Sequence, residues 1–148
     1  MDFTKLAIEL EEEEGNKPYA YQDHLGYWTI GIGILIDKRK GGGLRPEEVT
    51  FIFENRMRIL AEELQERLPW FNTLVDARQR VLMQMAFQMG VDGLMGFVNT
   101  LRMIEQGKYM MAAAGMLQSK WAKQTPDRAA RLSKMMETGI PPAVYGTA

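Results

Sequence analysis

The sequence contains no cysteine and only one histidine, His24. Without cysteine the chain can form no disulfide, no thiolate nucleophile and no cysteine-ligated metal site. A single histidine cannot supply a histidine-rich zinc site, and neither an EF-hand loop nor an HExxH pattern occurs. We therefore expect no metal and no cofactor.

Long hydrophobic runs and a strong excess of either charge are also missing. No segment approaches the roughly 18 apolar residues of a membrane-spanning helix. The stretch MDFTKLAIELEEEE is too acidic for a signal peptide. The net charge is −1, far from the basic balance typical of nucleic-acid-binding proteins. We expect synthesis in the cytoplasm, no stable membrane insertion and no nucleic-acid partner.

Composition and periodicity predict a single globular domain of the α+β class. With 46% hydrophobic and 25% charged residues, 148 residues suffice for one domain with a real core. Residues 18–36 are rich in aromatic and β-branched side chains around a turn at 23–26, which predicts a β-hairpin. Apolar spacing and glycine or proline stops predict helices over 2–14, from 46 to near 69, and over 76–89, 96–106, 108–123 and 126–138.

These elements form two lobes joined by the long helix that begins at Pro46. We expect a small lobe over about 15–60 and a mainly helical lobe over about 1–14 and 61–148. A cleft between two lobes is the natural place for an active site. The many methionines of the helical half are expected to fill gaps in its core.

Glu14 differs from the three glutamates that precede it. On a helical projection it lies about 30° from the mean direction of the apolar residues, whereas the other three lie about 70° to 170° away. It also stands at the C-terminal end of the helix, where the macrodipole disfavours a negative charge. An inward carboxyl in that position suits a proton donor, although an inward glutamate is more often a structural ion-pair partner.

Asp23 and Thr29 follow on the predicted hairpin. Each is ordinary when taken alone, because aspartate is common in turns and threonine in strands. Together with Glu14 they provide two carboxyl groups and a hydroxyl, the apparatus with which glycoside hydrolases protonate a leaving oxygen and direct a water. The hairpin aromatics can stack on sugar rings or belong to a core.

Several motifs resemble the phage lysozymes of the T-even type, glycoside hydrolase family 24. The resemblance is carried by Glu14-Gly15, Tyr21, Asp23 and GYWTIGIG at 26–33, and continues with FQMG at 87–90, GFVNTLRM at 96–103 and SKWAKQTPDRA at 119–129. It covers nearly the whole chain. The resemblance implies a lysozyme-like fold and inverting hydrolysis of the β-1,4 bond between N-acetylmuramic acid and N-acetylglucosamine in bacterial peptidoglycan.

By this resemblance Glu14 matches the catalytic acid, Asp23 the second carboxylate and Thr29 the threonine that helps to hold the attacking water. Arg128 matches an arginine that pairs with the acid. The positions that match the saccharide site are Leu35, Phe87, Gln88 and Thr100, where Thr100 replaces a serine.

Two departures from the family pattern stand out. Gly115 occupies the place of an asparagine that contacts the glycan, and a short link ending in Gly41-Gly42-Gly43 replaces a longer insertion, which shortens the small lobe. We expect a monomeric endolysin that is made in the host cytoplasm, acts on the cell wall after release and depends on a separate holin. The alternatives are a catalytically impaired glycan-binding domain and a lytic transglycosylase, which would need no water-holding pair.

Overall fold

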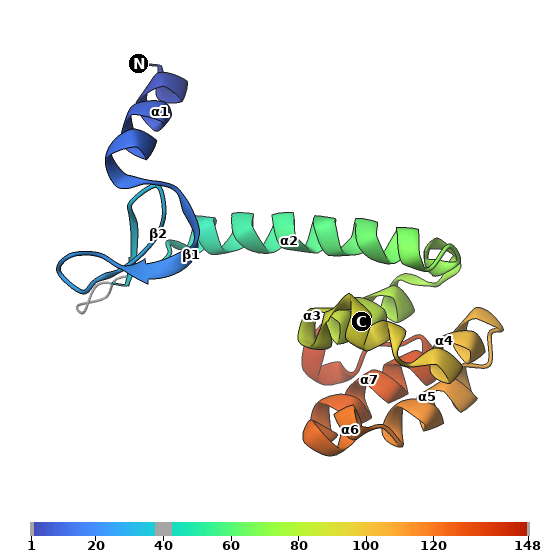
Figure 1. The fold of residues 1–148 in the computed structure, drawn as a ribbon. Helices are drawn as coiled ribbons and strands as arrows, with labels where there is room; N and C mark the ends of the chain where they lie inside the picture. Colours follow the sequence, from blue (N-terminus) through green and yellow to red (C-terminus); the bar gives the residue numbers. More distant parts are fainter. Residues whose placement is uncertain (1, 38–42, 148) are drawn as a thin grey trace. The chain divides into compact units, whose positions relative to one another are not determined.

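A computed structural model of the protein describes residues 2–37 and 43–147 (Figure 1). The chain divides into two compact units, Met1–Phe53 and Glu54–Ala148. The boundary falls within α2 (Pro46–Arg67), a helix that begins with Pro46 and carries Glu47 and Glu48 in its first turn. Proline and acidic residues both favour a helix N-terminus.

The first unit begins with α1 (Phe3–Glu14), and both predicted ends are confirmed. The Asp2 carboxylate accepts hydrogen bonds at 3.1 Å from the N–H groups of Thr4 and Lys5, which otherwise lack partners. Gly15 ends the helix with a φ of 75° and donates its N–H to the Glu11 carbonyl at 2.8 Å. This stop fixes Glu14 as the last helical residue.

Three antiparallel strands follow in the order β1 (Lys17–Gln22), β2 (Trp28–Gly31) and β3 (Ile34–Asp37). The predicted turn at 23–26 connects β1 to β2, and a second turn connects β2 to β3. The expectation of a two-stranded hairpin was therefore one strand short. Tyr21 pairs with Thr29, and Thr29 pairs with Leu35, so these side chains form a row across one face of the sheet.

The second unit holds the rest of α2 and five further α-helices among its described residues. They are α3 (Asp76–Met95), α4 (Val98–Glu105), α5 (Tyr109–Leu117), α6 (Lys120–Gln124) and α7 (Pro126–Thr138), with short 3₁₀ turns at Phe71–Thr73 and Ala143–Tyr145. The boundaries of α7 agree with the prediction. The helix predicted over 108–123 is instead two helices, because the Ser119 hydroxyl accepts from the Ala122 N–H at 3.1 Å and caps a new N-terminus.

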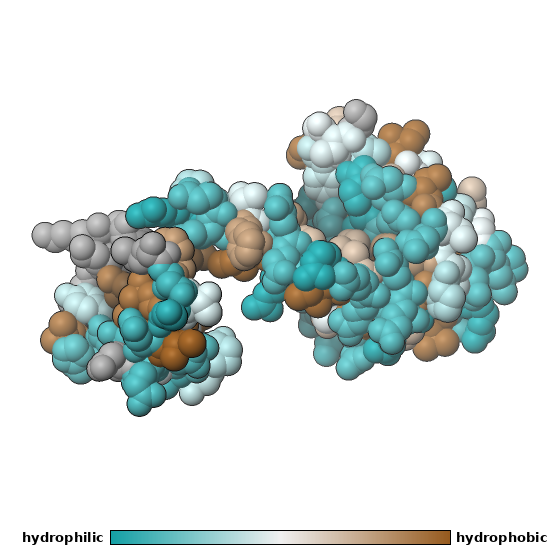
Figure 2. Space-filling view, turned by 90° about the horizontal axis from the view of Figure 1, so that it is seen from above, coloured by the Kyte–Doolittle hydropathy of each residue, from teal (hydrophilic) through white to brown (hydrophobic). Residues whose placement is uncertain are grey.

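The buried hydrophobic core of the described residues belongs to the second unit. Its largest fully buried side chains are Leu64, Val81, Leu82, Met85, Leu94, Ile104, Met116, Leu132, Met135 and Met136. Four of these are methionines, which confirms that role for them, whereas Met110 and Met111 are exposed. Apolar side chains also appear among polar ones on the surfaces of both units (Figure 2).

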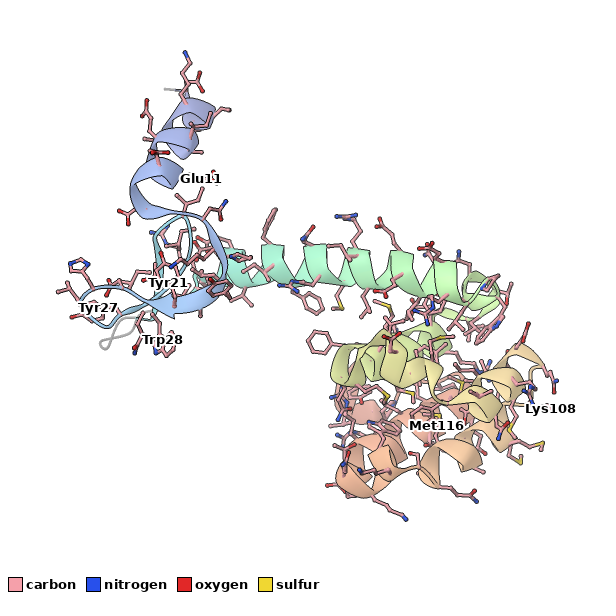
Figure 3. The ribbon with its side chains drawn as sticks, in the orientation of Figure 1. Glu11, Tyr21, Tyr27, Trp28, Lys108 and Met116 are labelled. Carbon is pink, nitrogen blue, oxygen red and sulfur yellow. The ribbon has the colours of Figure 1, made fainter. Side chains whose placement is uncertain are left out.

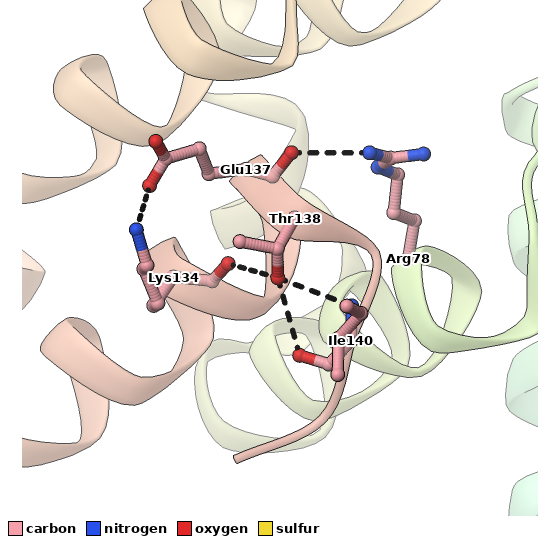
Figure 4. A network of polar contacts seen from close by, with 5 residues as sticks. All are labelled: Arg78, Lys134, Glu137, Thr138 and Ile140. Carbon is pink, nitrogen blue, oxygen red and sulfur yellow. Dashed lines mark hydrogen bonds and ion pairs between the residues drawn. The ribbon is translucent and has the colours of Figure 1, made fainter. Parts of the chain in front are cut away.

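Arg78 of α3 ties three helices of this unit together. Its Nε donates to the Met136 carbonyl at 2.8 Å, near the end of α7. Its Nη2 donates to the Glu137 carbonyl at 3.1 Å (Figure 4). Its guanidinium also stacks 3.5 Å from the centre of the Tyr109 ring in α5. These contacts satisfy carbonyls that a helix end leaves without partners.

The helices and the small antiparallel sheet confirm the predicted α+β class and are consistent with the predicted lysozyme-like fold. The structure groups α1 with the sheet, so the expected association of residues 1–14 with the helical lobe stays a prediction. The link at 38–42 lies outside the described residues. Within the described chain, no single helix is both long and apolar enough to cross a membrane, and only α3 with α4, bent by 102°, reaches that criterion as a pair.

Candidate active site

A pocket of about 480 Å³ lies within the first unit. Its lining residues come from the end of α1, the three strands and their turns. They are Glu14, Lys17, Tyr21, Gln22, Asp23, His24, Tyr27, Thr29, Gly33 and Leu35. The pocket therefore contains Glu14, Asp23, Thr29 and Leu35, four of the residues predicted from the sequence.

Glu14 reaches the pocket because α1 stops directly after it. Its side chain is exposed and packs against the backbone of Gly33 in the turn between β2 and β3. Within the described residues Glu14 forms no ion pair. The carboxyl is thus open to a ligand in the pocket.

Asp23 is held in place through one of its two oxygens. Oδ1 accepts hydrogen bonds from the N–H groups of Leu25 and Tyr27, both at 2.9 Å. Oδ1 thus stabilises the turn, as the side chain of a turn aspartate commonly does. Oδ2 has no hydrogen bond to a described residue and can take part in chemistry. The turn therefore fixes the orientation of the carboxylate and leaves one oxygen available.

Thr29 lies in β2 with only 5% of its surface exposed. Its hydroxyl donates to the Tyr27 carbonyl at 3.2 Å, and a carbonyl can only accept. The hydroxyl proton is therefore directed toward Tyr27, and the oxygen lone pairs remain free to accept a hydrogen bond. A water in the pocket could donate one.

The walls of the pocket combine flat apolar surface with positive charge. Tyr21, Thr29 and Leu35 form the row across the sheet, and Tyr27 also lines the pocket. Figure 3 shows Tyr21 and Tyr27 on the strands and turn of the first unit. The Lys17 ammonium lies 4.4 Å from the centre of the Tyr21 ring, a cation–π contact that holds it at the wall. A ring face, an aliphatic surface and a cation suit a polar ligand with flat apolar parts.

The remaining predicted residues belong to the second unit. Phe87 is exposed, and the Gln88 Oε1 accepts from the Trp121 indole N–H at 2.9 Å. Thr100 is 7% exposed and lines a separate pocket of about 350 Å³ with Gly115. Arg128 is half-buried and donates to the Gln84 carbonyl at 3.4 Å. Its pairing with Glu14 stays a prediction.

Sequence reasoning missed several residues of the pocket, notably Lys17, His24 and Gly33. Lys17 and His24 carry no signal of their own in the sequence. Gly33 does, because a glycine within a strand-like pattern indicates a bulge or a close backbone approach. No group of three or more histidine, aspartate or glutamate side chains in the described residues is arranged to hold a metal ion.

Comparison with known proteins finds a matching family and several relatives. The sequence profile described as "Phage lysozyme" matches residues 11–136. The chain is 29% identical to "Probable T4-type lysozyme 1" of Dictyostelium discoideum, over 88% of this chain and 92% of that protein. It is 30% identical to "Probable T4-type lysozyme 2" of the same organism, over 92% and 95%.

A phage protein also matches. The chain is 33% identical to "Peptidoglycan hydrolase gp36" of Pseudomonas phage phiKMV, over 86% of this chain and 14% of that protein. The match to the phage lysozyme profile spans most of the chain and includes Glu14, Asp23 and Thr29. The protein therefore belongs to the phage lysozyme family.

Proposed function

We propose that the protein is a muramidase, an endolysin that hydrolyses the β-1,4 bond between N-acetylmuramic acid and N-acetylglucosamine in bacterial peptidoglycan. Membership of the phage lysozyme family supports this activity, as does similarity to a protein named as a peptidoglycan hydrolase. The observation that carries the residue assignment is the pocket in which Glu14, Asp23 and Thr29 meet.

Glu14 is the proposed general acid. Its exposed carboxyl donates a proton to the glycosidic oxygen as the bond from that oxygen to the anomeric carbon breaks. The leaving sugar then departs as a neutral alcohol. The other sugar passes through a state with oxocarbenium character, whose positive charge nearby carboxylates stabilise.

Asp23 and Thr29 are proposed to direct the attacking water. The free Oδ2 of Asp23 accepts a proton from the water, while the Thr29 oxygen accepts a second hydrogen bond from it. The new bond forms between the water oxygen and the anomeric carbon on the face opposite the leaving oxygen. One displacement of this kind inverts the anomeric configuration.

The sugar rings are proposed to lie against Tyr21, Tyr27 and Leu35 in the pocket. Phe87, Gln88 and Thr100 are proposed to contact the glycan from the second unit, and Arg128 to pair with Glu14. The exposed ring of Phe87 supports such a contact, whereas Gly115 offers no side chain to a ligand.

Digestion of purified cell walls, followed by mass analysis of the fragments, tests the reaction. Hydrolysis leaves reducing ends, whereas a lytic transglycosylase leaves anhydro sugars. Glu14→Gln serves as the matched variant, because the amide keeps the shape of the side chain but cannot donate the acid proton. We expect the rate of hydrolysis to fall by roughly 10²-fold or more with the melting temperature, Tm, unchanged or slightly higher.

If Glu14→Gln hydrolysed cell walls at the wild-type rate, Glu14 could not be the general acid. Binding of cell walls without any hydrolysis by the wild type would instead identify a glycan-binding domain. Loss of activity together with a large fall in Tm would make Glu14 mainly a structural partner of Arg128.

The route to the substrate is a further part of the proposal. We propose that a monomer accumulates in the host cytoplasm and reaches the wall through a membrane opened by a separate holin. Expression in bacteria tests this route: lysis is expected only after chloroform treatment or co-expression of a pore-forming protein. Lysis by the enzyme alone would contradict it, and sedimentation of the purified protein tests the monomer.

A further inference from the structure

Two glycines with nearly the same backbone conformation lie where β2 leads into β3: Gly31 is the last residue of β2, and Gly33 lies in the turn that follows. Gly31 has a φ of 62° and Gly33 a φ of 64°. These left-handed values are readily adopted by glycine and are strained for a residue with a Cβ atom. Alanine would therefore be strained at both positions.

Their surroundings differ sharply. A Cβ atom at Gly31 would lie 3.9 Å from the Cδ1 of Ile34, which is an ordinary van der Waals contact. A Cβ atom at Gly33 would lie 2.9 Å from Cγ, 3.0 Å from Cβ and 3.1 Å from Cδ of Glu14. The bare backbone of Gly33 is thus in direct contact with the stem of the Glu14 side chain.

Glu14 could not simply rotate away from a side chain at residue 33. One of the close atoms is its Cβ, which no side-chain torsion moves, and the backbone behind it is the last turn of α1. The hydrogen bond from the Gly15 N–H to the Glu11 carbonyl, at 2.8 Å, closes that turn. A Cβ at residue 33 would therefore displace either the end of α1, which carries the carboxyl carbon, or the β2–β3 turn. Both changes alter the position of the carboxyl relative to the pocket.

We propose that Gly33 is a positioning residue for the catalytic acid: its missing side chain sets where the Glu14 carboxyl lies in the pocket. This inference rests on the proposed role of Glu14 as the acid. It assigns to the second glycine of the GIG sequence a function in addition to forming a turn. Because the geometry of proton transfer is strict, a displacement of about 1 Å is enough to slow the reaction roughly 10²-fold.

Gly31→Ala is the matched control for Gly33→Ala, since both variants introduce an alanine at a left-handed φ within three residues of the same hairpin. We expect Gly33→Ala to lower kcat on soluble peptidoglycan fragments by about 10²-fold. For Gly31→Ala we expect kcat within about threefold of the wild type. We expect KM within about threefold for both variants, because neither substitution alters Tyr21, Tyr27 or Leu35, against which the sugar rings are proposed to lie. If kcat fell equally in the two variants, backbone strain alone would explain the loss, and the proposal would be overturned.

Thermal unfolding provides a second test that does not require activity. Gly33→Ala is expected to lower Tm by about 3 °C more than Gly31→Ala, because only the former adds a steric clash. Glu14→Ala removes Cγ and Cδ, two of the three close atoms. In the Glu14→Ala background the difference between the two glycine variants should therefore shrink, and an unchanged difference would contradict the contact.

Glu14→Gln, measured in the same assays, separates this inference from the proposed function. If Glu14→Gln retains full activity, the assignment of the acid fails, and the positioning role fails with it. If Glu14→Gln is inactive while Gly33→Ala keeps the kcat of Gly31→Ala, only the positioning role fails.

Discussion

The hydroxyl group of Thr100 occupies the space that a side chain at Gly115 would need. A Cβ atom at residue 115 would lie 2.9 Å from the Thr100 Oγ1, closer than non-bonded atoms approach. Thr100 is buried in α4 and Gly115 lies in α5, so the contact joins two packed helices. Threonine is β-branched and therefore changes rotamer less easily than serine would. Thr100, which replaces a serine of the family pattern, and Gly115, which replaces an asparagine, thus lie next to one another.

Because of this contact, we expect Gly115→Ala to destabilise the wild-type protein but to stabilise the Thr100→Ala variant. Replacing a helical glycine by alanine normally stabilises a protein by about 0.5–1 kcal/mol. In the wild-type background we expect the clash with Thr100 to outweigh this gain, so that the free energy of unfolding falls. In a Thr100→Ala background the same change should raise it by about 0.5–1 kcal/mol. Urea unfolding of the four proteins measures the coupling, and additive effects would contradict the contact.

Two substitutions of Asp23 should distinguish its role in catalysis from its role in stabilising the turn. In Asp23→Asn the amide oxygen can still accept from the N–H groups of Leu25 and Tyr27, but the side chain can no longer accept the proton of a water. We expect hydrolysis to be lost with little change in Tm. Asp23→Ala removes the acceptor as well and should cost about 1 kcal/mol of stability. If Asp23→Asn kept wild-type activity, a base role for Asp23 would be ruled out.

Thr29 is expected to act through its oxygen. Thr29→Ser keeps the hydroxyl and should retain activity, whereas the nearly isosteric Thr29→Val should lower kcat by roughly tenfold or more, because the water loses an acceptor. The stability cost should stay below about 1 kcal/mol, since the Tyr27 carbonyl also accepts from the Asp23 N–H at 2.9 Å. Equal kcat for the serine and valine variants would show that the hydroxyl is not used.

Two serines of the second unit should respond to alanine in opposite directions. Ser133 is 2% exposed, and its Oγ has no hydrogen-bond partner among the described residues. Ser133→Ala should therefore stabilise the protein by about 1 kcal/mol. Ser119 caps α6 and also donates to the Met116 carbonyl at 2.7 Å, so Ser119→Ala should destabilise it by about 1 kcal/mol. Thermal unfolding of both variants checks the pair, and a loss of stability in Ser133→Ala would indicate a partner for its hydroxyl.

Capping residues and helix-ending glycines in the sequence were sufficient to predict the helices α1 and α7. Asp2 and Gly15 define α1, and Pro126 and Gly139 define α7, because these residue types satisfy or end a helix whatever surrounds them. Tertiary packing decided the rest. Residues 91–95 return to helix after the non-helical Gly90, although they include a glycine, and two of them, Val91 and Leu94, are buried in the core.

The predicted cleft between the lobes stays a prediction, but individual residues of the pocket could be predicted where their chemistry can be read from the residue type. Glu14, Asp23 and Thr29 are titratable or hydroxyl groups in a recognisable order, and the structure brings them together. The contact of Gly33 with Glu14 could not be predicted, because it depends on how α1 and the β2–β3 turn approach each other. Periodicity describes each element alone, whereas such an approach is a property of the packed chain.

The contacts of Arg78 have a consequence for synthesis on the ribosome. The carbonyls of Met136 and Glu137, which its guanidinium binds, are 58 and 59 residues further along the chain. The helix α7 (Pro126–Thr138) is synthesised last of the α-helices described, so the surface that it offers to α3 is missing until then. The helical unit can therefore close only late in translation. Until then chaperones could bind the nascent chain, whose exposed leucines and methionines are those that later fill the core.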